Sequence, residues 1–137
     1  MDKQTSKMSQ ADALLLICLC AIQVDERIKA VELRKLVHII SLNPMYSHIK
    51  DPLEYLSALN KKFFDYEIGE VIDESIGVLT QPMRETAYAW ACEVVIADSG
   101  VSQEEHTFLK LLVKKMGLHG ELAGKISAVV AILNRKE

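Results

Sequence analysis

The amino-acid sequence predicts an all-α fold: a single compact domain of about seven helices built from two similar helix-turn-helix halves. Apolar residues recur at helical spacing in successive segments, and no segment alternates apolar and polar residues as a strand would. Residues typical of helix caps separate these segments. A short pattern of acidic and aliphatic residues also occurs twice, once in each half of the chain.

The composition favours one soluble domain. The 137 residues are 50% hydrophobic and 26% charged, which is enough apolar material for a core. The net charge of −3 argues against a nucleic-acid-binding surface. The longest apolar run, residues 13–22, is shorter than the roughly 20 residues that span a bilayer, so we expect no membrane span.

Three cysteines, Cys18, Cys20 and Cys92, lie in apolar helical sequence and lack the Cys-x-x-Cys spacing of metal or redox sites. We expect reduced thiols that pack in the core. Reduced thiols favour a cytoplasmic location.

Residues 1–8 are polar, and we expect a disordered tail there, followed by a helical domain over residues 9–134. A capping box at Ser9 and Asp12 begins the first helix, which we expect to run to about Val24 with other helices all around it. The later helices are expected over residues 33–40, 52–64, 68–79, 83–97, 103–116 and 122–133.

One segment is markedly acidic, with Asp65, Glu67, Glu70, Asp73 and Glu74. We interpret it as a solvated helix face, with a docking patch for a basic partner as the alternative. Glu93 interrupts the apolar run of the fifth helix, and we expect it to face solvent because buried carboxylates need partners. The alternative is that it projects toward the acidic motif just beyond it.

The repeated pattern is Asp, two residues, Val or Ile, three residues, Glu. A shift of 73 residues places Asp25 on Asp98 and Glu32 on Glu105, and it also aligns the aliphatic residues of the following helices. Two similar helix-turn-helix units are therefore expected, one in each half.

At these residues the sequence resembles the TerB-like family, which is named for a tellurite-resistance protein and also occurs as a domain in some membrane-anchored co-chaperones. The resemblance lies in residues 97–101 with Glu105, in residues 108–118, and in the weaker counterpart formed by Val24, Asp25, Ile28 and Glu32. It implies an all-helical domain in which the two acidic motifs lie near one another, with a divalent-metal or small-ligand site between them. The sequence departs from the family pattern at Arg27, which stands where the motif usually has glycine, as at Gly100.

Two hypotheses explain the acidic motifs. In the first, the residues are helix caps: Asp98 bonds the amides of its turn, and Glu105 completes a capping box with Ser102. In the second, Asp25, Glu32, Asp98 and Glu105 bind a hard divalent cation such as Ca²⁺, Mg²⁺ or Mn²⁺. The second hypothesis follows from the helix dipole, which disfavours an aspartate at a helix C-terminus unless a cation compensates for it.

The sequence contains no Gly-x-Ser-x-Gly elbow, no glycine-rich phosphate loop and no convincing Cys/His pair, so we expect no catalytic residues. Our leading hypothesis is a non-enzymatic cytoplasmic module, similar to TerB-like proteins of tellurite resistance and other stress responses, that binds a divalent cation or a protein partner. The alternative is a protein-interaction or scaffold domain that uses an acidic surface without metal. Homodimerisation remains open.

Overall fold

The computed structural model describes residues 8–24, 30–96 and 101–135, and within these ranges the protein is an all-α domain without strands. This confirms the predicted fold class. The helices in chain order are α1 (Gln10–Gln23), α2 (Ala30–Leu42), the 3₁₀ helix η2 (Pro44–Tyr46), α3 (Pro52–Lys62), α4 (Ile68–Val78), α5 (Gln81–Ile96), α6 (Gln103–Met116) and α7 (Gly120–Leu133). None of them is long and apolar enough to cross a membrane.

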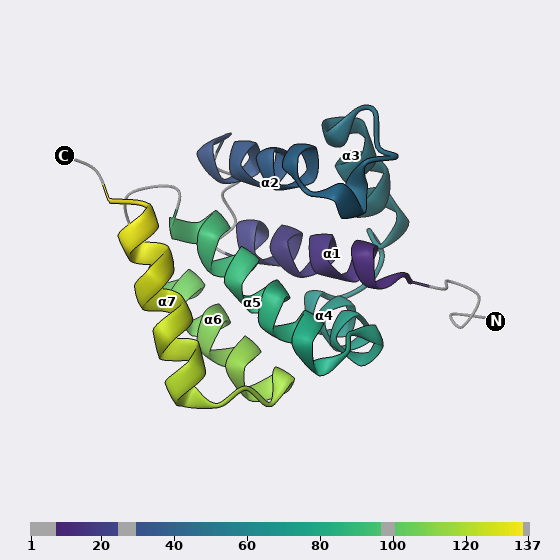
Figure 1. Ribbon diagram of the computed structural model, residues 1–137. Helices are drawn as coiled ribbons and strands as arrows, with labels where there is room; N and C mark the ends of the chain where they lie inside the picture. Colours follow the sequence, from purple (N-terminus) through teal and green to yellow (C-terminus); the bar gives the residue numbers. More distant parts are fainter. Residues whose placement is uncertain (1–7, 25–29, 97–100, 136–137) are drawn as a thin grey trace.

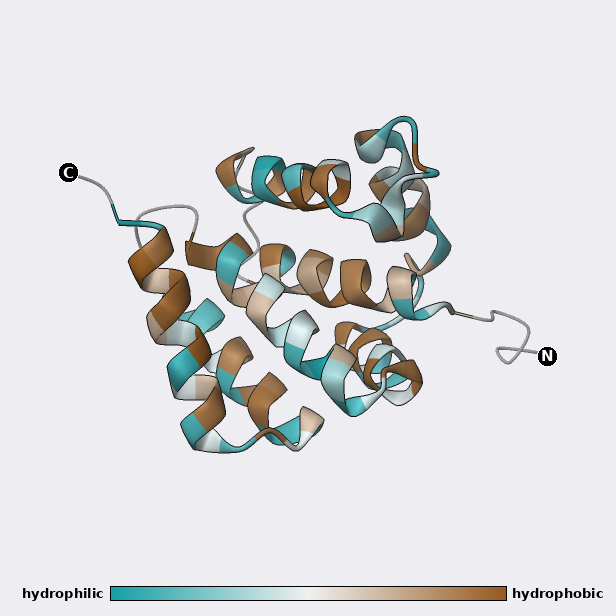
Figure 2. Cartoon of the chain, in the orientation of Figure 1, coloured by the Kyte–Doolittle hydropathy of each residue, from teal (hydrophilic) through white to brown (hydrophobic). Residues whose placement is uncertain are grey.

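Helix α1 lies at the centre of the domain. All residues from Ala13 to Ile22 are buried, as expected for a helix with neighbours on every side. Its largest contacts are with α5 and α4, and it also touches α2, α3 and α6. Figure 1 shows α1 crossing the middle of the molecule, with α2 and α3 on one side and α4 and α5 on the other. In Figure 2 it is hydrophobic along most of its length.

The predicted helix starts are confirmed where a short polar side chain precedes the helix. Ser9 Oγ accepts a hydrogen bond from the Asp12 amide at 3.0 Å, and Asp51 Oδ1 accepts one from the Glu54 amide at 3.1 Å. Each bond satisfies one of the amides that the first turn leaves without a helical partner.

The side chain of Asp12 does not complete the capping box that the sequence predicts. Its Oδ1 instead accepts a hydrogen bond of 2.6 Å from the hydroxyl of Tyr55, and so links α1 to α3. A nearby hydroxyl, Tyr46 Oη, donates to the carbonyl of Ala11 at 2.7 Å. The start of α1 is thus held by two tyrosines from distant parts of the chain.

The two halves follow the predicted repeat. Helices α1 and α5 end 73 residues apart, at Gln23 and Ile96, and α2 and α6 begin 73 residues apart, at Ala30 and Gln103. Equivalent residues of α1 and α5 are buried in both halves, in the pairs Leu14 and Ala87, Leu15 and Tyr88, Cys18 and Ala91, Ala21 and Val94, and Ile22 and Val95. The central α1–α5 contact therefore joins the same helix of each repeat.

Glu93 does not simply face solvent. Its Oε1 accepts a hydrogen bond from Asn134 Nδ2 at 2.7 Å, and its Oε2 lies 3.4 Å from Lys35 Nζ. The carboxylate therefore links α5 to α2 and to the end of α7. These two partners account for its partial burial.

The three cysteines are free and buried, as predicted. Desolvation raises the pKa of the Cys20 thiol from 9.0 to about 12, and burial also raises the pKa of Cys18 and Cys92. Thiols in this state pack as small apolar groups, because the reactive thiolate is suppressed.

We predict that the free energy of unfolding falls as the pH rises above about 9. In that range the unfolded chain releases thiol protons that the native state retains up to about pH 12 at Cys20, so alkali favours the unfolded chain. Urea unfolding at a series of pH values measures the decline. The Cys20→Ala variant is expected to show a shallower decline than the wild type; equal slopes would contradict the assignment to this thiol.

Two glycines are expected to respond to alanine with opposite signs. Gly117 ends α6 with φ of 69°, where a side chain is strained, so Gly117→Ala is expected to lower the free energy of unfolding by about 1 kcal/mol. Gly124 lies within α7, and a Cβ there would meet no atom within 4 Å. Gly124→Ala is therefore expected to raise the free energy of unfolding by about 0.5–1 kcal/mol. Urea denaturation measures both, and a shift of the same sign in the two variants would contradict the account.

Candidate functional site

The four proposed ligands lie in, or shortly after, the two segments of sequence that join α1 to α2 and α5 to α6. The structure describes two of them, Glu32 and Glu105. Asp25 and Asp98 lie outside the described residues. The geometry of the site is therefore built from the two glutamates and from the helix ends that bound the turns.

Glu105 forms the predicted capping box at the start of α6. Its Oε1 accepts a hydrogen bond from the Ser102 amide at 3.0 Å, and Ser102 Oγ accepts one from the Glu105 amide at 3.1 Å. Glu105 is fully buried, which is unusual for a carboxylate in a small domain. The capping hypothesis is thus confirmed for this residue, and one of its oxygens is engaged by the backbone.

Glu32 occupies the equivalent position in the first repeat. It is the third residue of α2, as Glu105 is the third residue of α6, and it is also fully buried. The third helical position places a carboxylate near the free amides and the positive end of the helix dipole. Both halves therefore have a buried carboxylate near the start of their second helix.

The two turns are bounded by helix ends on one side of the molecule. Helices α1 and α5 pack side by side. Their C-terminal ends and the start of α2 all lie at the left of Figure 1. Asp25 and Asp98, which follow α1 and α5 in sequence, lie outside the described residues.

Among the described residues, no group of three or more His, Cys, Asp or Glu side chains is arranged to hold a metal ion. Glu32 and Glu105 thus supply at most part of a ligand set, and a four-carboxylate site requires Asp25 and Asp98. The four histidines, His38, His48, His106 and His119, are exposed and do not add to such a set.

The acidic segment before and within α4 is largely solvated, in agreement with the simpler interpretation. Several of its carboxylates have structural roles. Glu67 and Glu70 form the capping box of α4, in which Glu70 Oε1 accepts a hydrogen bond from the Glu67 amide at 3.0 Å. Asp73 forms a salt bridge of 2.8 Å with Lys115, which ties α4 to α6.

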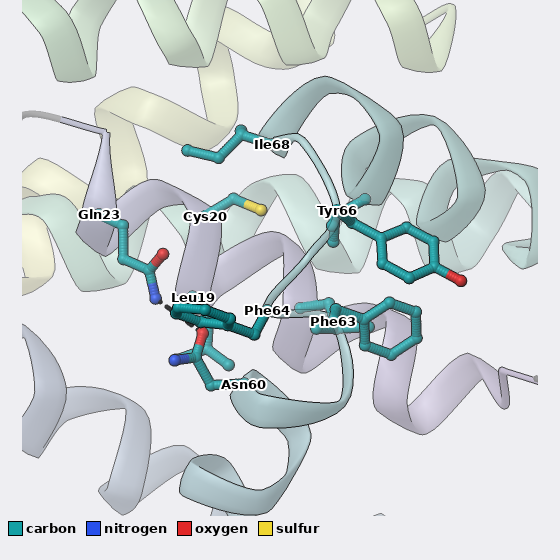
Figure 3. A pocket seen from close by; sticks show the side chains of 10 residues that line it. Leu19, Cys20, Gln23, Asn60, Phe63, Phe64, Tyr66 and Ile68 are labelled. Atoms are coloured by element: carbon teal, nitrogen blue, oxygen red, sulfur yellow. Dashed lines mark hydrogen bonds between the residues drawn. The ribbon is translucent and has the colours of Figure 1, made fainter.

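A cavity that the sequence did not reveal lies between α1, the end of α3 and the start of α4. It has a volume of about 450 Å³, which is in the range of small-molecule pockets. Figure 3 shows Ile68 and Phe64 on opposite sides of it, with Cys20 between them. The amide of Gln23 donates to Asn60 Oδ1 at 3.0 Å beside this cavity. Its walls come from three separate segments, so no local motif could have indicated it.

Comparisons with family models, with curated proteins and with solved structures gave no match.

We predict that Ser102→Ala lowers the free energy of unfolding by about 1 kcal/mol, because the variant loses the hydroxyl that accepts a hydrogen bond from the Glu105 amide. Urea unfolding without added metal measures the loss. Ser57→Ala is the matched control, since Ser57 is exposed within α3 and alanine is the better helix former. A loss no larger than that of the control would contradict a structural role for the cap.

Proposed function

We propose that this protein is a non-enzymatic, cytoplasmic module of the TerB-like kind, which acts in tellurite resistance or a related stress response by binding a divalent cation. A small cationic ligand would use the same site. The proposed ligands are Asp25, Glu32, Asp98 and Glu105, and the expected ions are Ca²⁺, Mg²⁺ and Mn²⁺, which prefer oxygen ligands.

The observation that supports this proposal most strongly is the pair of fully buried glutamates at equivalent positions of two repeats. Carboxylate oxygens are the ligands that these hard divalent cations prefer. Helices α1 and α5 pack side by side, and their C-terminal ends lie on one side of the molecule (Figure 1). The proposal requires Asp25 and Asp98, which follow these helices in sequence, to share one ion. A cation there would offset the unfavourable position of each aspartate after a helix C-terminus.

The two repeats are not expected to contribute equally. Arg27 stands in the first motif where the second has Gly100. A guanidinium that pairs with carboxylates neighbouring it in sequence would compete with a metal ion for them. The second turn is therefore the stronger half of the proposed site.

Isothermal titration calorimetry on metal-free protein tests the proposal. We expect saturable heat with at least one of Ca²⁺, Mg²⁺ and Mn²⁺, together with a rise in melting temperature, since a ligand at 100 times its Kd adds about 2.7 kcal/mol of stability. The double variant Asp25→Asn with Asp98→Asn is expected to lose both signals.

The matched control is Asp65→Asn with Glu121→Gln, which removes the same charge from two exposed positions outside the turns. It is expected to bind like the wild type. The proposed cation site would be contradicted if none of the three ions gave heat or a thermal shift. It would also be contradicted if the aspartate double variant bound an ion as tightly as the wild type.

A second candidate function is a protein-interaction or scaffold domain that needs no metal. The observation that favours it is the charge of one surface: residues 63–80 contain five acidic residues and no Lys, Arg or His, and four of the five, Asp65, Glu67, Glu70 and Asp73, are exposed. A basic partner would be attracted to this surface.

A further inference from the structure

Helix α4 has no counterpart among the described helices of the second half. The shift of 73 residues places α5 on α1, α6 on α2 and most of α7 on α3, and α7 is the last helix of the part of the chain that the structure describes. The helix contacts follow this correspondence: α1 contacts α3 and α6, and α5 contacts their counterparts, α7 and α2. Since α4 packs against α1 and α6, its counterpart would lie against α5 and α2.

One side of α5 is less buried than the equivalent side of α1. Four residues of α5 are only partly buried, although their equivalents in α1 are buried. They recur at spacings of three and four residues, so they share one side of the helix. The pairs are Thr86 and Ala13, Ala89 and Leu16, Trp90 and Ile17, and Glu93 and Cys20.

On α1 this side faces α4. Leu16 and Cys20 line the cavity of Figure 3 together with residues from the start of α4. Helix α4 buries Val71, Ile72 and Ile76, and it makes one of the two largest contacts of α1. The complete burial of α1 thus depends on α4, whereas no described helix covers the equivalent side of α5.

The uncovered side of α5 forms the floor of a groove between α2 and α7, which we call the α5 groove. It consists of two adjoining recesses of about 290 and 420 Å³, and Trp90 and Glu93 line both of them. Its apolar walls include Leu42 of α2 and Val129 and Leu133 of α7, which are 76%, 53% and 72% exposed. In Figure 2 the C-terminal half of α7 is largely hydrophobic. An exposed apolar patch of this kind is typical of an interaction surface.

Charge does not select the occupant of the α5 groove. Its lining includes Lys35, His38 and Lys125 as well as the carboxylate of Glu93. That carboxylate already contacts Lys35 and Asn134, so it requires no charged group from an occupant. The evidence for the occupant is the repeat itself, because the equivalent position in the first half is filled by a helix with an aliphatic stripe.

We propose that the α5 groove binds an amphipathic helix of a partner protein, which packs on α5 as α4 packs on α1. The helix has Ile, Leu or Val at spacings of three and four residues on the side that meets Trp90, and uncharged polar residues suffice at its edges. Helix α4 itself already lies on α1, and each stretch outside the described residues is shorter than the 11 residues of α4, so the helix comes from outside these 137 residues. This inference rests on neither the cation site nor the acidic segment.

Trp90 reports directly on the α5 groove, because it is the only tryptophan of the sequence and lines both recesses. The full chain is titrated with a peptide of Leu, Ala and Gln, about five helical turns long, in which Leu recurs at spacings of three and four residues. A peptide of the same composition without helical periodicity is the control. We expect the periodic peptide to shift the emission of Trp90 to shorter wavelength and to reduce its quenching by acrylamide. We also expect it to bind at least about tenfold more tightly than the control peptide.

Two substitutions on α7 place the peptide. Val129→Lys and Leu133→Lys each put a cation on the apolar wall, and each is expected to weaken binding at least about tenfold. Leu53→Lys is the matched control, because Leu53 is 54% exposed on α3 and lies outside the groove. The control variant is expected to bind like the wild type. Circular dichroism and melting temperature verify that the variants are folded.

Three results would overturn the inference. The first is a periodic peptide that changes the emission and quenching of Trp90 no more than the control peptide does. The second is equal affinity in the wild type, Val129→Lys and Leu133→Lys. The third is a dimer in analytical ultracentrifugation that Leu133→Lys dissociates, with Trp90 shielded from acrylamide before any peptide is added, since the occupant is then a second copy of this chain.

Discussion

The contact between α1 and α5 is the one on which the rest of the structure depends. Helix α1 is buried from Ala13 to Ile22, so it can exist only with neighbours on every side, and α5 is one of its two most extensive neighbours. The buried residues of α5 include Ala87 and Ala91, whose small side chains allow a helix to approach closely. The remaining helices cover the sides of this pair, and the amphipathic patterns of α2, α4 and α6 follow from that role.

The same contact determines where the acidic turns lie. Because the two central helices are equivalent in the repeat and pack side by side, their C-terminal ends lie on one side of the domain. Each turn leads into a helix whose third residue is a buried glutamate, Glu32 or Glu105. At Glu105, one carboxylate oxygen acts in the cap of α6 by accepting a hydrogen bond from the Ser102 amide.

Features determined by neighbours in the chain could be predicted from the sequence. Ser9, Asp51, Ser102 and Gly117 act on the turn next to them, and the structure confirms the cap or helix stop expected at each. The repeat could be predicted as well, because its register is visible as a shift in sequence. Both depend only on spacing along the chain.

Features that depend on distant segments could not be predicted. Asp12 bonds Tyr55 on α3 instead of completing its own cap, and Glu93 finds Lys35 and Asn134 instead of solvent. The cavity beside Cys20 has walls from segments far apart in sequence. In each case the partner is chosen by helix packing, which local spacing does not encode. The placement of Asp25 and Asp98, on which the shared cation site depends, belongs to the same class.

Native-state hydrogen exchange measured by NMR tests the central role of the α1–α5 pair most directly. We expect the amides of residues 14–22 and 87–95 to exchange most slowly, with opening free energies equal to the free energy of global unfolding, because neither helix can leave the core alone. Helices α2 and α7, at the periphery, are expected to open at lower free energies. If the amides of α1 exchange through an opening that costs clearly less free energy than the opening of α5, the two helices do not form one cooperative core, and the account is wrong.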